Sequence, residues 1–301
     1  MKQLSVFILI VLFPSLLLAQ DDLMNLLNQN TAPETNYTTA TFKSTRIING
    51  HSIERMLPGQ LDFRISHRFG MLNSGAYNLY GLDGPANMHF SLEYGIFNWL
   101  MIGVGRGSYE KTFDGFTKFS ILRQSTGVRE MPVSVSVFTS AALNSLKWTD
   151  TTRTNYFSSR LSYTAQILVA RKFSQGFSFQ LTPSFVHRNL VGTELDPNDL
   201  YAIGAGGRIK LSKRISLNAE YYWLLNANNQ YMSQPIYNPL SIGVDIETGG
   251  HVFQIMLTNS LAMIEKGFIG ETTGQWRHRD IHLGFNISRV FTLKKYPQKK
   301  Q

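Results

Sequence analysis

Few side chains in this 301-residue chain have types and spacings that suggest a reactive centre. His278 and His282 are four residues apart, a spacing that lets two histidines on a helix bind zinc. They fall at a predicted loop–strand junction, where such residues would lie ~13 Å apart, so no metal site is predicted there. The stretch Glu194–Asp199 offers oxygen ligands suited to calcium. It lacks the glycine and the spacing of a calcium-binding loop, which favours an ordinary polar loop.

Nucleophilic catalysis is equally weakly supported. The chain has no cysteine, which excludes disulfides, thiolate zinc sites, cysteine nucleophiles and a lipoprotein anchor. Ser260, in TNSLAM, is not part of a G-x-S-x-G signature, and no other local signature marks a serine as a nucleophile. We therefore predict no catalytic residues, no cofactor and no enzyme activity, with a barrel hydrolase as the least favoured alternative.

The start of the chain has the pattern of an export signal. Lys2 is followed by an apolar run, Leu4–Leu18, and by Ala19 as a small residue at the cleavage point. No later run is apolar over ~18 residues, so no helical membrane span is predicted. The hydrophobic fraction of 43% and the mean hydropathy of −0.13 also exclude a polytopic helical protein. The net charge of +9 would suit a nucleic-acid partner, but an exported chain does not meet nucleic acid, so we predict no nucleic-acid partner.

Period-two alternation dominates from Gly59 onward. In IHLGFNISRVF (Ile281–Phe291) nearly every second residue is large and apolar, while the residues between are mostly small or polar. The same pattern recurs in QLDFRISHRF, MHFSLEYGIF, SRLSYTAQILVA, ISLNAEYYW and LSIGVDIE. Successive strand side chains point to opposite faces, so these are two-faced strands. We count about twelve of them up to Phe291, several with the ~9–11 residues that cross a bilayer.

The connections between these strands sort by length. Short ones alternate with long ones, which is typical of a transmembrane barrel and has no reason to occur in the alternative, a soluble two-sheet sandwich. We therefore predict an all-β fold, a closed antiparallel up-and-down transmembrane β-barrel. The short connections are Phe97–Asn98, the longer STGVREM, Phe173–Gly176, Ser212–Arg214 and Thr248–Gly250, and the long ones are Gly70–Asn87, Leu143–Phe157, Arg188–Leu200, Asn226–Pro239 and Asn259–Arg279, with Ser108–Gly115 of modest length. Aromatic residues at strand ends fit interfacial girdles: Phe97, Trp99, Phe173, Phe177, Trp223 and Phe291.

Six segments also carry a family resemblance. LDFRISHRFG, NMHFSLEYGIFNWLMIGVGRG, DGFTKFSILRQ, VFQIMLTNS, GFIGETTGQW and IHLGFNISRVF together resemble a family of Bacteroidetes outer-membrane β-barrels of unknown function (DUF5777-like). The resemblance covers roughly Ile47 to Phe291 and implies an outer-membrane barrel. It implies no catalytic residues. The tail TLKKYPQKKQ departs from outer-membrane proteins that end at their closing strand.

The strand faces opposite the apolar ones should line the lumen. Their charges indicate either a polar channel or binding cavity, or a closed interior that pairs its own charges, and the sequence leaves both open. Inward glycines such as Gly103, Gly105, Gly107, Gly204 and Gly206 would leave room, or mark strand curvature. The predicted lumen-facing residues are Asp62, Arg64, Arg68, His89, Glu93, Arg160, Arg208, Lys210, Glu220, Asp245 and Glu247.

The predicted organisation has four parts. A signal peptide (1–19) precedes a periplasmic lead-in (20–58) that could end in a strand around Thr39–Ile48; the barrel (59–291) and a basic periplasmic tail (292–301) follow. The expected location is a bacterial outer membrane, with membrane lipid, the barrel-assembly machinery and a periplasmic partner as contacts. The expected role is transport or binding of small solutes through a polar lumen. The alternative is a structural or partner-docking barrel with a filled lumen.

Overall fold

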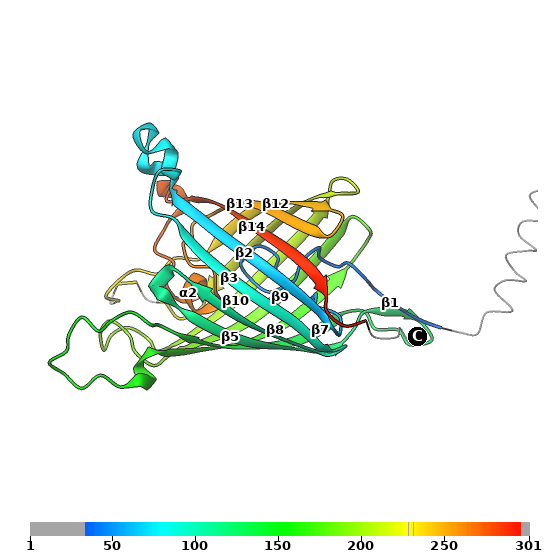
Figure 1. The fold of residues 1–301 in the computed structure, drawn as a ribbon, viewed down its shortest axis with the longest axis horizontal. Coiled ribbons are helices and arrows are strands. Elements are labelled where there is room, and N and C mark those ends of the chain that lie inside the picture. The colour runs from blue at the N-terminus through cyan, green and yellow to red at the C-terminus, as the bar shows by residue number, and fades with distance from the viewer. Residues whose placement is uncertain (1–33, 228, 231, 296–301) are drawn as a thin grey trace, which may run out of the picture.

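The computed structural model describes residues 34–227, 229–230 and 232–295. The predicted signal peptide (1–19), most of the lead-in (20–33) and the end of the tail (296–301) lie outside these residues. Within the described part, every helix is too short or too polar to cross a bilayer. The dominant element is one closed barrel of twelve antiparallel strands, in the order β2-β3-β4-β5-β7-β8-β9-β10-β11-β12-β13-β14 and back to β2 (Figure 1).

The elements follow the alternating segments closely. β3 and β12, for example, begin and end within one residue of the runs MHFSLEYGIF and LSIGVDIE. The strands are β1 (Thr35–Tyr37), β2 (Gln60–Met71), β3 (Asn87–Phe97), β4 (Leu100–Gly107), β5 (Phe113–Leu122), β6 (Ser125–Gly127), β7 (Ser134–Leu143), β8 (Leu161–Lys172), β9 (Phe177–Arg188), β10 (Asp199–Lys210), β11 (Ile215–Leu224), β12 (Leu240–Thr248), β13 (His251–Thr258) and β14 (His282–Thr292). The helices are η1 (Leu72–Ser74), η2 (Ala76–Gly81), η3 (Tyr109–Lys111), η4 (Phe157–Arg160), α2 (Glu265–Gly270) and η5 (Trp276–His278).

The two faces of each strand differ as the alternation predicts. On β11, Asn218 and Glu220 are buried inside the barrel, whereas Ala219, Tyr221 and Trp223 are exposed on its outer surface. Large apolar side chains therefore cover the outside, the arrangement of a barrel whose surroundings are apolar.

The barrel closes through its first and last strands. β14 pairs antiparallel with β2, with Ile287 opposite Ile65. On the outer surface of this seam His67 stacks on Phe285, with ring centroids 4.9 Å apart. His67, which interrupts the apolar face in the sequence, thus packs as an aromatic ring. Closure leaves no bare strand edge, as a bilayer requires.

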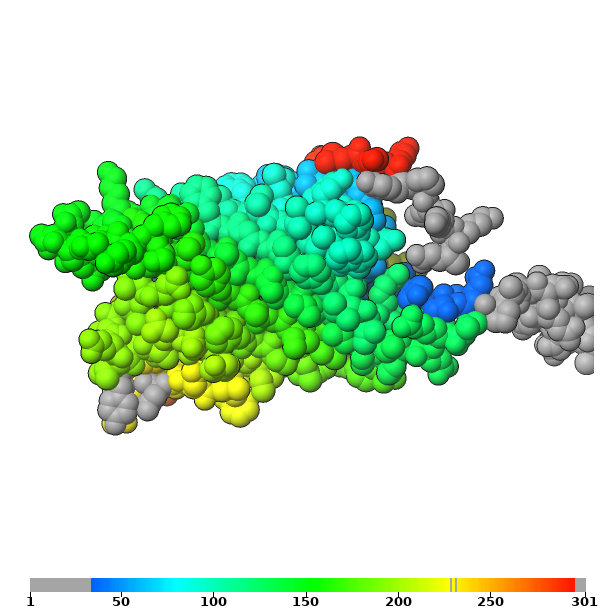
Figure 2. All heavy atoms as spheres, turned by 90° about the horizontal axis from the view of Figure 1, so that it is seen from below, coloured from blue at the N-terminus to red at the C-terminus, as the bar shows by residue number. Residues whose placement is uncertain are grey.

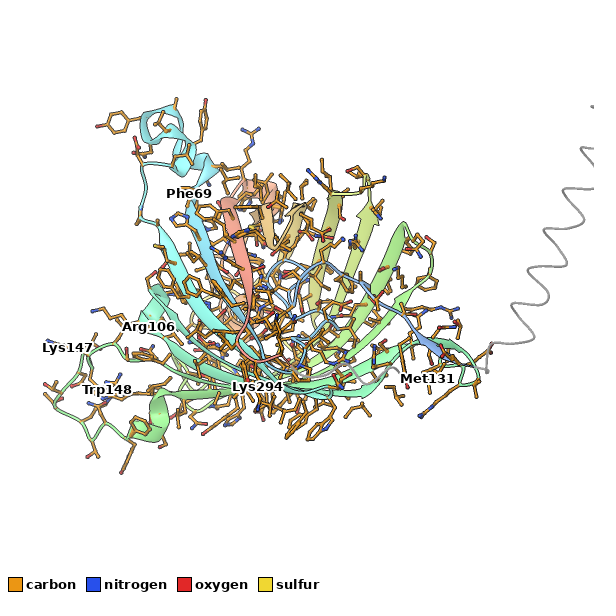
Figure 3. The ribbon with its side chains drawn as sticks, turned by 45° about the vertical axis from the view of Figure 1, so that its right-hand side comes forward. Phe69, Arg106, Met131, Lys147, Trp148 and Lys294 are labelled. Carbon is orange, nitrogen blue, oxygen red and sulfur yellow. The ribbon has the colours of Figure 1, made fainter. Side chains whose placement is uncertain are left out.

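The connections sort by length as predicted. One end of the barrel carries the short turns, the start of β2 and the end of β14, and is called the turn end. The opposite end is called the loop end. Figure 3 labels Met131 at the turn end and Lys147 and Trp148 at the loop end. In Figure 2 the β7–β8 loop, in bright green, projects beyond an otherwise continuous wall.

The lead-in does not form the strand that could be expected around Thr39–Ile48. The lead-in strand is β1 (Thr35–Tyr37), which precedes this range and pairs with β6 in a small sheet at the turn end. Residues after β1 turn into the barrel as irregular chain, the dark blue coil inside the wall in Figure 1. Their polar backbone is bound by side chains of the wall rather than by a neighbouring strand, so the strand expected around Thr39–Ile48 does not form.

Candidate functional site in the barrel lumen

Residues Thr41–Glu54, called the inner segment, occupy the turn-end half and the middle of the lumen. Almost all of them are buried: Asn49 is 2% exposed, and His51 and Ser52 are fully enclosed. A buried irregular segment must satisfy its backbone groups with other partners, because no ladder does so. The wall of the barrel supplies those partners.

Glu220 of β11 holds the middle of the inner segment. Its carboxylate accepts hydrogen bonds from the backbone N–H groups of Ile48 (3.2 Å), Asn49 (2.7 Å) and Gly50 (3.1 Å). Gly50 fits there because it has no side chain: a Cβ would lie 2.0 Å from the hydroxyl oxygen of Tyr222. One wall carboxylate therefore binds three successive amides, the way an anion is held in a backbone concavity.

A charged cluster on β2 and β3 binds the preceding residues. Glu93 accepts a hydrogen bond from the Thr45 hydroxyl (2.6 Å) and pairs with Arg46 (3.3 Å). Arg64 pairs with Asp62 (3.0 Å) and also donates to Thr45 (2.9 Å). These buried charges are paired and hydrogen-bonded, which offsets much of the cost of removing them from water.

Lys118 of β5 completes the set, and the sequence analysis missed it. Its ammonium donates to the carbonyl oxygens of Ser52 (3.0 Å) and Glu54 (2.8 Å), and it is only 1% exposed. Asp114, Phe116, Lys118 and Ser120 alternate on the inward face of β5, so the period-two pattern contained the signal. The aromatic Phe116 within that series obscured it.

Apolar packing also holds the inner segment. Four of its side chains are buried against inward-facing apolar residues of the wall. A lumen that only carries polar solutes has no need of such residues, so this part of the interior resembles the core of a soluble domain. The cluster comprises Phe42, Ile47, Ile48 and Ile53 of the inner segment with Met101, Phe116, Phe138, Leu168, Ala170 and Met256 of the wall.

The β13–β14 loop fills the lumen from the loop end. It carries α2, whose six residues are all buried, and Phe268 packs on Tyr222 with ring centroids 5.0 Å apart. Where the loop meets the inner segment, Glu265 lies 3.8 Å from His51. Burial raises the pKa of Glu265 to about 7 and lowers that of His51 well below its usual range. Both groups are therefore neutral in mildly acidic solution, and the contact is not an ion pair there.

A second ionic contact fixes the same loop near the loop end. The ammonium of Lys266 bonds to Glu271 (2.6 Å) and to Glu110 of η3. Burial lowers the pKa of Lys266, but Glu271 and Glu110 outweigh it and raise that pKa above its usual value. The loop is thus anchored to its neighbour by a charge that persists over the physiological range.

Eight of the eleven predicted lumen residues are buried inside the barrel. Of these, Arg64, Arg68, Glu93, Arg208 and Glu220 contact the inner segment, Arg68 through the Asn49 side chain (2.7 Å) and Arg208 through the Thr41 carbonyl (3.3 Å). The inward glycines leave room that is occupied: a Cβ on Gly206 would meet Ile47 at 2.4 Å. The eight are Asp62, Arg64, Arg68, His89, Glu93, Arg208, Glu220 and Asp245.

The other three predicted lumen residues lie toward the two ends of the barrel. Arg160 belongs to η4 in the β7–β8 loop, where it stacks over Trp148 at 4.2 Å, because β8 begins only at Leu161. Lys210 is exposed, because it is the last residue of β10 at the turn end. Glu247, also near the turn end, pairs with Lys43 just inside the barrel mouth. Alternation assigns a face, but at a strand end that face opens to solvent.

The remaining sequence candidates have structural partners. Asp196 accepts hydrogen bonds from the backbone N–H groups of Thr193 (2.7 Å) and Ser233 (2.8 Å), which ties two loops together. Ser260 is buried and donates to the Ala262 carbonyl (3.2 Å). At the start of β14, Nδ1 of His282 lies 2.8 Å from the carbonyl oxygen of Phe69 in β2.

Two histidine–aspartate pairs have the spacing of a general base and its orienting acid. His89 and Asp114 are 2.7 Å apart inside the barrel, and His187 and Asp199 are 2.5 Å apart at the loop end. A hydrolase also needs a hydroxyl on the other side of the histidine. Among the described residues, neither histidine is hydrogen-bonded to a serine or threonine hydroxyl.

Comparison with solved structures finds bacterial outer-membrane barrels. A NanC porin is 8% identical with a TM-score of 0.48, over 78% of this chain and 100% of that one. The KdgM porin is 8% identical (TM-score 0.46, 77% and 99% coverage), and outer membrane phospholipase A from Escherichia coli is 13% identical (TM-score 0.42, 77% and 90%). At these scores the likeness carries no functional information. No curated protein is significantly similar to the chain.

The family comparison agrees with the geometry described above. The profile described as "Membrane bound beta barrel domain (DUF5777)" matches residues 42–291, which include both the wall and nearly all of the inner segment. The chain belongs to this family of membrane-bound β-barrel domains.

Proposed function

We propose that the protein passes small polar solutes across a bacterial outer membrane, with its turn end in the periplasm, and that the inner segment is a plug. The observation that carries the proposal is the way the plug is bound. Its backbone is held by polar side chains of the wall, among them Glu220, Lys118 and Gln254, which donates to the Ile47 carbonyl (2.9 Å). Once the plug is displaced, these same side chains are free to line an aqueous passage.

A second candidate is a permanently filled barrel that docks a periplasmic partner. The apolar cluster around Phe42, Ile47, Ile48 and Ile53 favours it. Burying each such side chain stabilises by ~1.5–3 kcal/mol, so releasing all four would cost roughly 6–12 kcal/mol. Spontaneous opening would then be rare, and a transporting barrel would need a partner or a ligand to move the plug.

A reversible crosslink separates the two candidates. The side-chain nitrogen Nδ2 of Asn49 lies 2.9 Å from the Ser241 hydroxyl, and the chain has no cysteine of its own. The double variant Asn49→Cys/Ser241→Cys can therefore lock the plug to β12 on oxidation, with Asn49→Cys alone as the control. We expect the reconstituted double variant to conduct ions when reduced and to stop conducting when oxidised. The conductance of the control should not depend on the redox state.

Other outcomes favour the second candidate. If neither redox state conducts, although the protein shows heat-modifiable gel migration typical of a folded barrel, spontaneous opening is refuted and the permanently filled barrel is favoured. If both states conduct equally, the plug is not the gate. Fractionation checks the location: the chain should sediment with outer membranes, and recovery from the soluble periplasm would contradict the proposal.

A further inference from the structure

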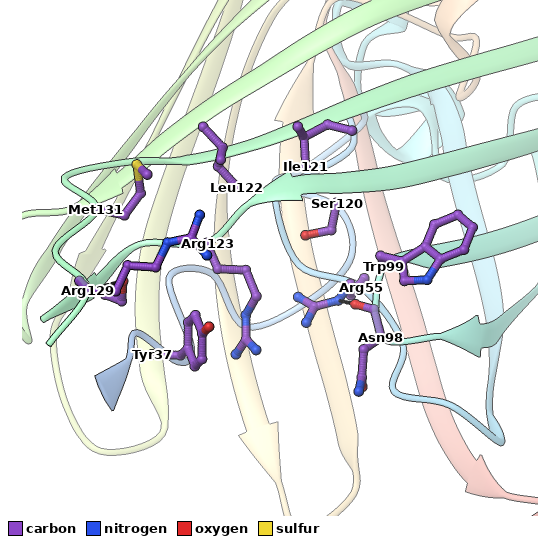
Figure 4. Close-up of a pocket in the computed structure, with 11 residues that line it drawn as sticks. Tyr37, Arg55, Asn98, Trp99, Ser120, Ile121, Leu122, Arg123, Arg129 and Met131 are labelled. Atoms are coloured by element: carbon purple, nitrogen blue, oxygen red, sulfur yellow. Dashed lines mark hydrogen bonds between the residues drawn. The ribbon is translucent and has the colours of Figure 1, made fainter. Parts of the chain in front are cut away.

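A pocket lies at the turn end of the barrel, between the β3–β4 turn, the end of β5, β1 and Arg55. Its volume is about 180 Å³, several times the space that one water molecule needs. In Figure 4 Tyr37, Arg123 and Arg129 lie on one side, and Arg55, Asn98 and Trp99 on the other. The pocket thus joins four parts of the chain that are distant in sequence.

Three guanidinium groups converge on this pocket. Arg55 donates through Nε to the Asn98 carbonyl, which directs it toward the β3–β4 turn, and Arg123 stacks over the Tyr37 ring at 4.2 Å. Arg129 is exposed at the rim. Within the described residues, none of the three forms an ion pair with a carboxylate.

The electrostatics of the pocket favour an anion. Burial, and then the positive charge of Arg123, lower the pKa of Arg55. The carboxylate of Glu54 acts in the opposite direction, and it accepts hydrogen bonds from the Thr41 (2.7 Å) and Phe42 (3.2 Å) backbone amides. Like charges held together without an ion-paired carboxylate leave a local field that an anion would neutralise.

The pocket also opens at the level of the aromatic girdle. Trp99, half-exposed, stacks between Phe97 (5.4 Å) and Phe119 (6.2 Å) on the outer surface. Ile121, which also lines the pocket, is 59% exposed on the same surface. Such aromatics sit at the headgroup level of a bilayer, so the arginines lie where lipid phosphates are found.

We propose that Arg55, Arg123 and Arg129 form a binding site for a phosphate ester, the headgroup of an anionic phospholipid in the leaflet at the turn end. Arginine forks match phosphate oxygens, and the girdle residues Trp99 and Ile121 offer an apolar surface to the acyl chains. Because Arg55 follows the inner segment, the bound headgroup would also join that segment to the barrel wall. The site does not depend on whether the lumen opens.

Native mass spectrometry of the full chain in detergent tests the site. The probes are a short-chain phosphatidylglycerol, the matching phosphatidylcholine and inorganic phosphate. We expect one phosphatidylglycerol to bind, and Arg123→Gln or Arg129→Gln to weaken it about tenfold or more. Arg171→Gln is the matched control, because Arg171 lies at the same end but stacks on Phe173, outside the pocket.

The outcomes distinguish a lipid headgroup from free phosphate as the ligand of the site. If inorganic phosphate binds as tightly as the lipid and with the same arginine dependence, the site takes a free phosphate and the lipid assignment is overturned. If Arg171→Gln weakens binding as much as Arg123→Gln, or if phosphatidylcholine binds equally in all variants, no specific site exists. Arg129→Gln keeps the test valid if Arg123→Gln fails to fold, since Arg129 is exposed.

Discussion

Replacing Glu220 by glutamine should loosen the inner segment while leaving the barrel wall intact. The carboxylate binds the amides of Ile48, Asn49 and Gly50 at 3.2, 2.7 and 3.1 Å. Hydrogen bonds to a charged group contribute ~1.5–3 kcal/mol each, and a buried amide left unpaired costs ~1–3 kcal/mol. Glutamine keeps one acceptor oxygen and turns an N–H₂ group toward the remaining amides, so at least one of them loses its partner.

The net magnitude is smaller than the sum of the lost bonds. A neutral amide does not have to be stripped of water as a carboxylate does, which offsets part of the loss. We estimate about 2 kcal/mol of weaker docking, which corresponds to roughly a thirtyfold rise in the open fraction of the segment. Hydrogen–deuterium exchange of a peptide covering 44–54 measures that fraction directly, because the three amides concerned belong to it.

The control is a buried carboxylate that does not touch the segment. Asp114 of β5 has a side chain that is 7% exposed and pairs with His89 of β3 (2.7 Å). Asp114→Asn removes a carboxylate from the same interior, so exchange in 44–54 should stay close to wild type. Equal exchange in the two variants would refute the reasoning, because the effect would then come from interior charge and not from the bonds to the inner segment.

Three other predictions follow from the faces, the loop and the closing strand. Thr164 is 3% exposed inside the filled barrel and Ala165 is exposed outside, so Thr164→Leu should destabilise by ~1–3 kcal/mol in urea titrations, and Ala165→Leu should have little effect. The pKa of Glu265 is raised by burial from 4.5 to about 7, so docking of the β13–β14 loop is most stable below pH 4.5 and loses stability, on the order of 3 kcal/mol, up to about pH 7. Hydrogen–deuterium exchange of a peptide covering 262–272, relative to the intrinsic rate at each pH, should rise over this range in wild type and stay flat in Glu265→Gln. Deleting 296–301 should leave heat-modifiability unchanged, whereas deleting 290–301 should abolish it, because Val290 and Phe291 pair with β2.

The strand pattern was predictable because it is local. Side chains of a strand alternate between two faces whatever the rest of the chain does, so runs such as ISLNAEYYW indicate both a strand and which of its residues share a face. Ala219 and Asn218 lie on the faces that this alternation assigns. The sorting of connections into short and long is also a property of the linear chain, and it predicted the up-and-down topology.

What occupies the lumen was decided only by the tertiary structure. Glu220 meets Asn49 across 171 residues of sequence, and the space beside Gly206 is filled by Ile47. The period-two alternation indicates that a side chain points inward. It does not indicate which residues that side chain contacts, because those contacts depend on strands and loops that barrel closure brings together. The sequence by itself therefore determined the barrel and the polarity of its faces. The sequence left open the choice between an open channel and an occupied interior. That choice depended on complementarity between the wall and Thr41–Glu54, a non-local property with no periodic signal.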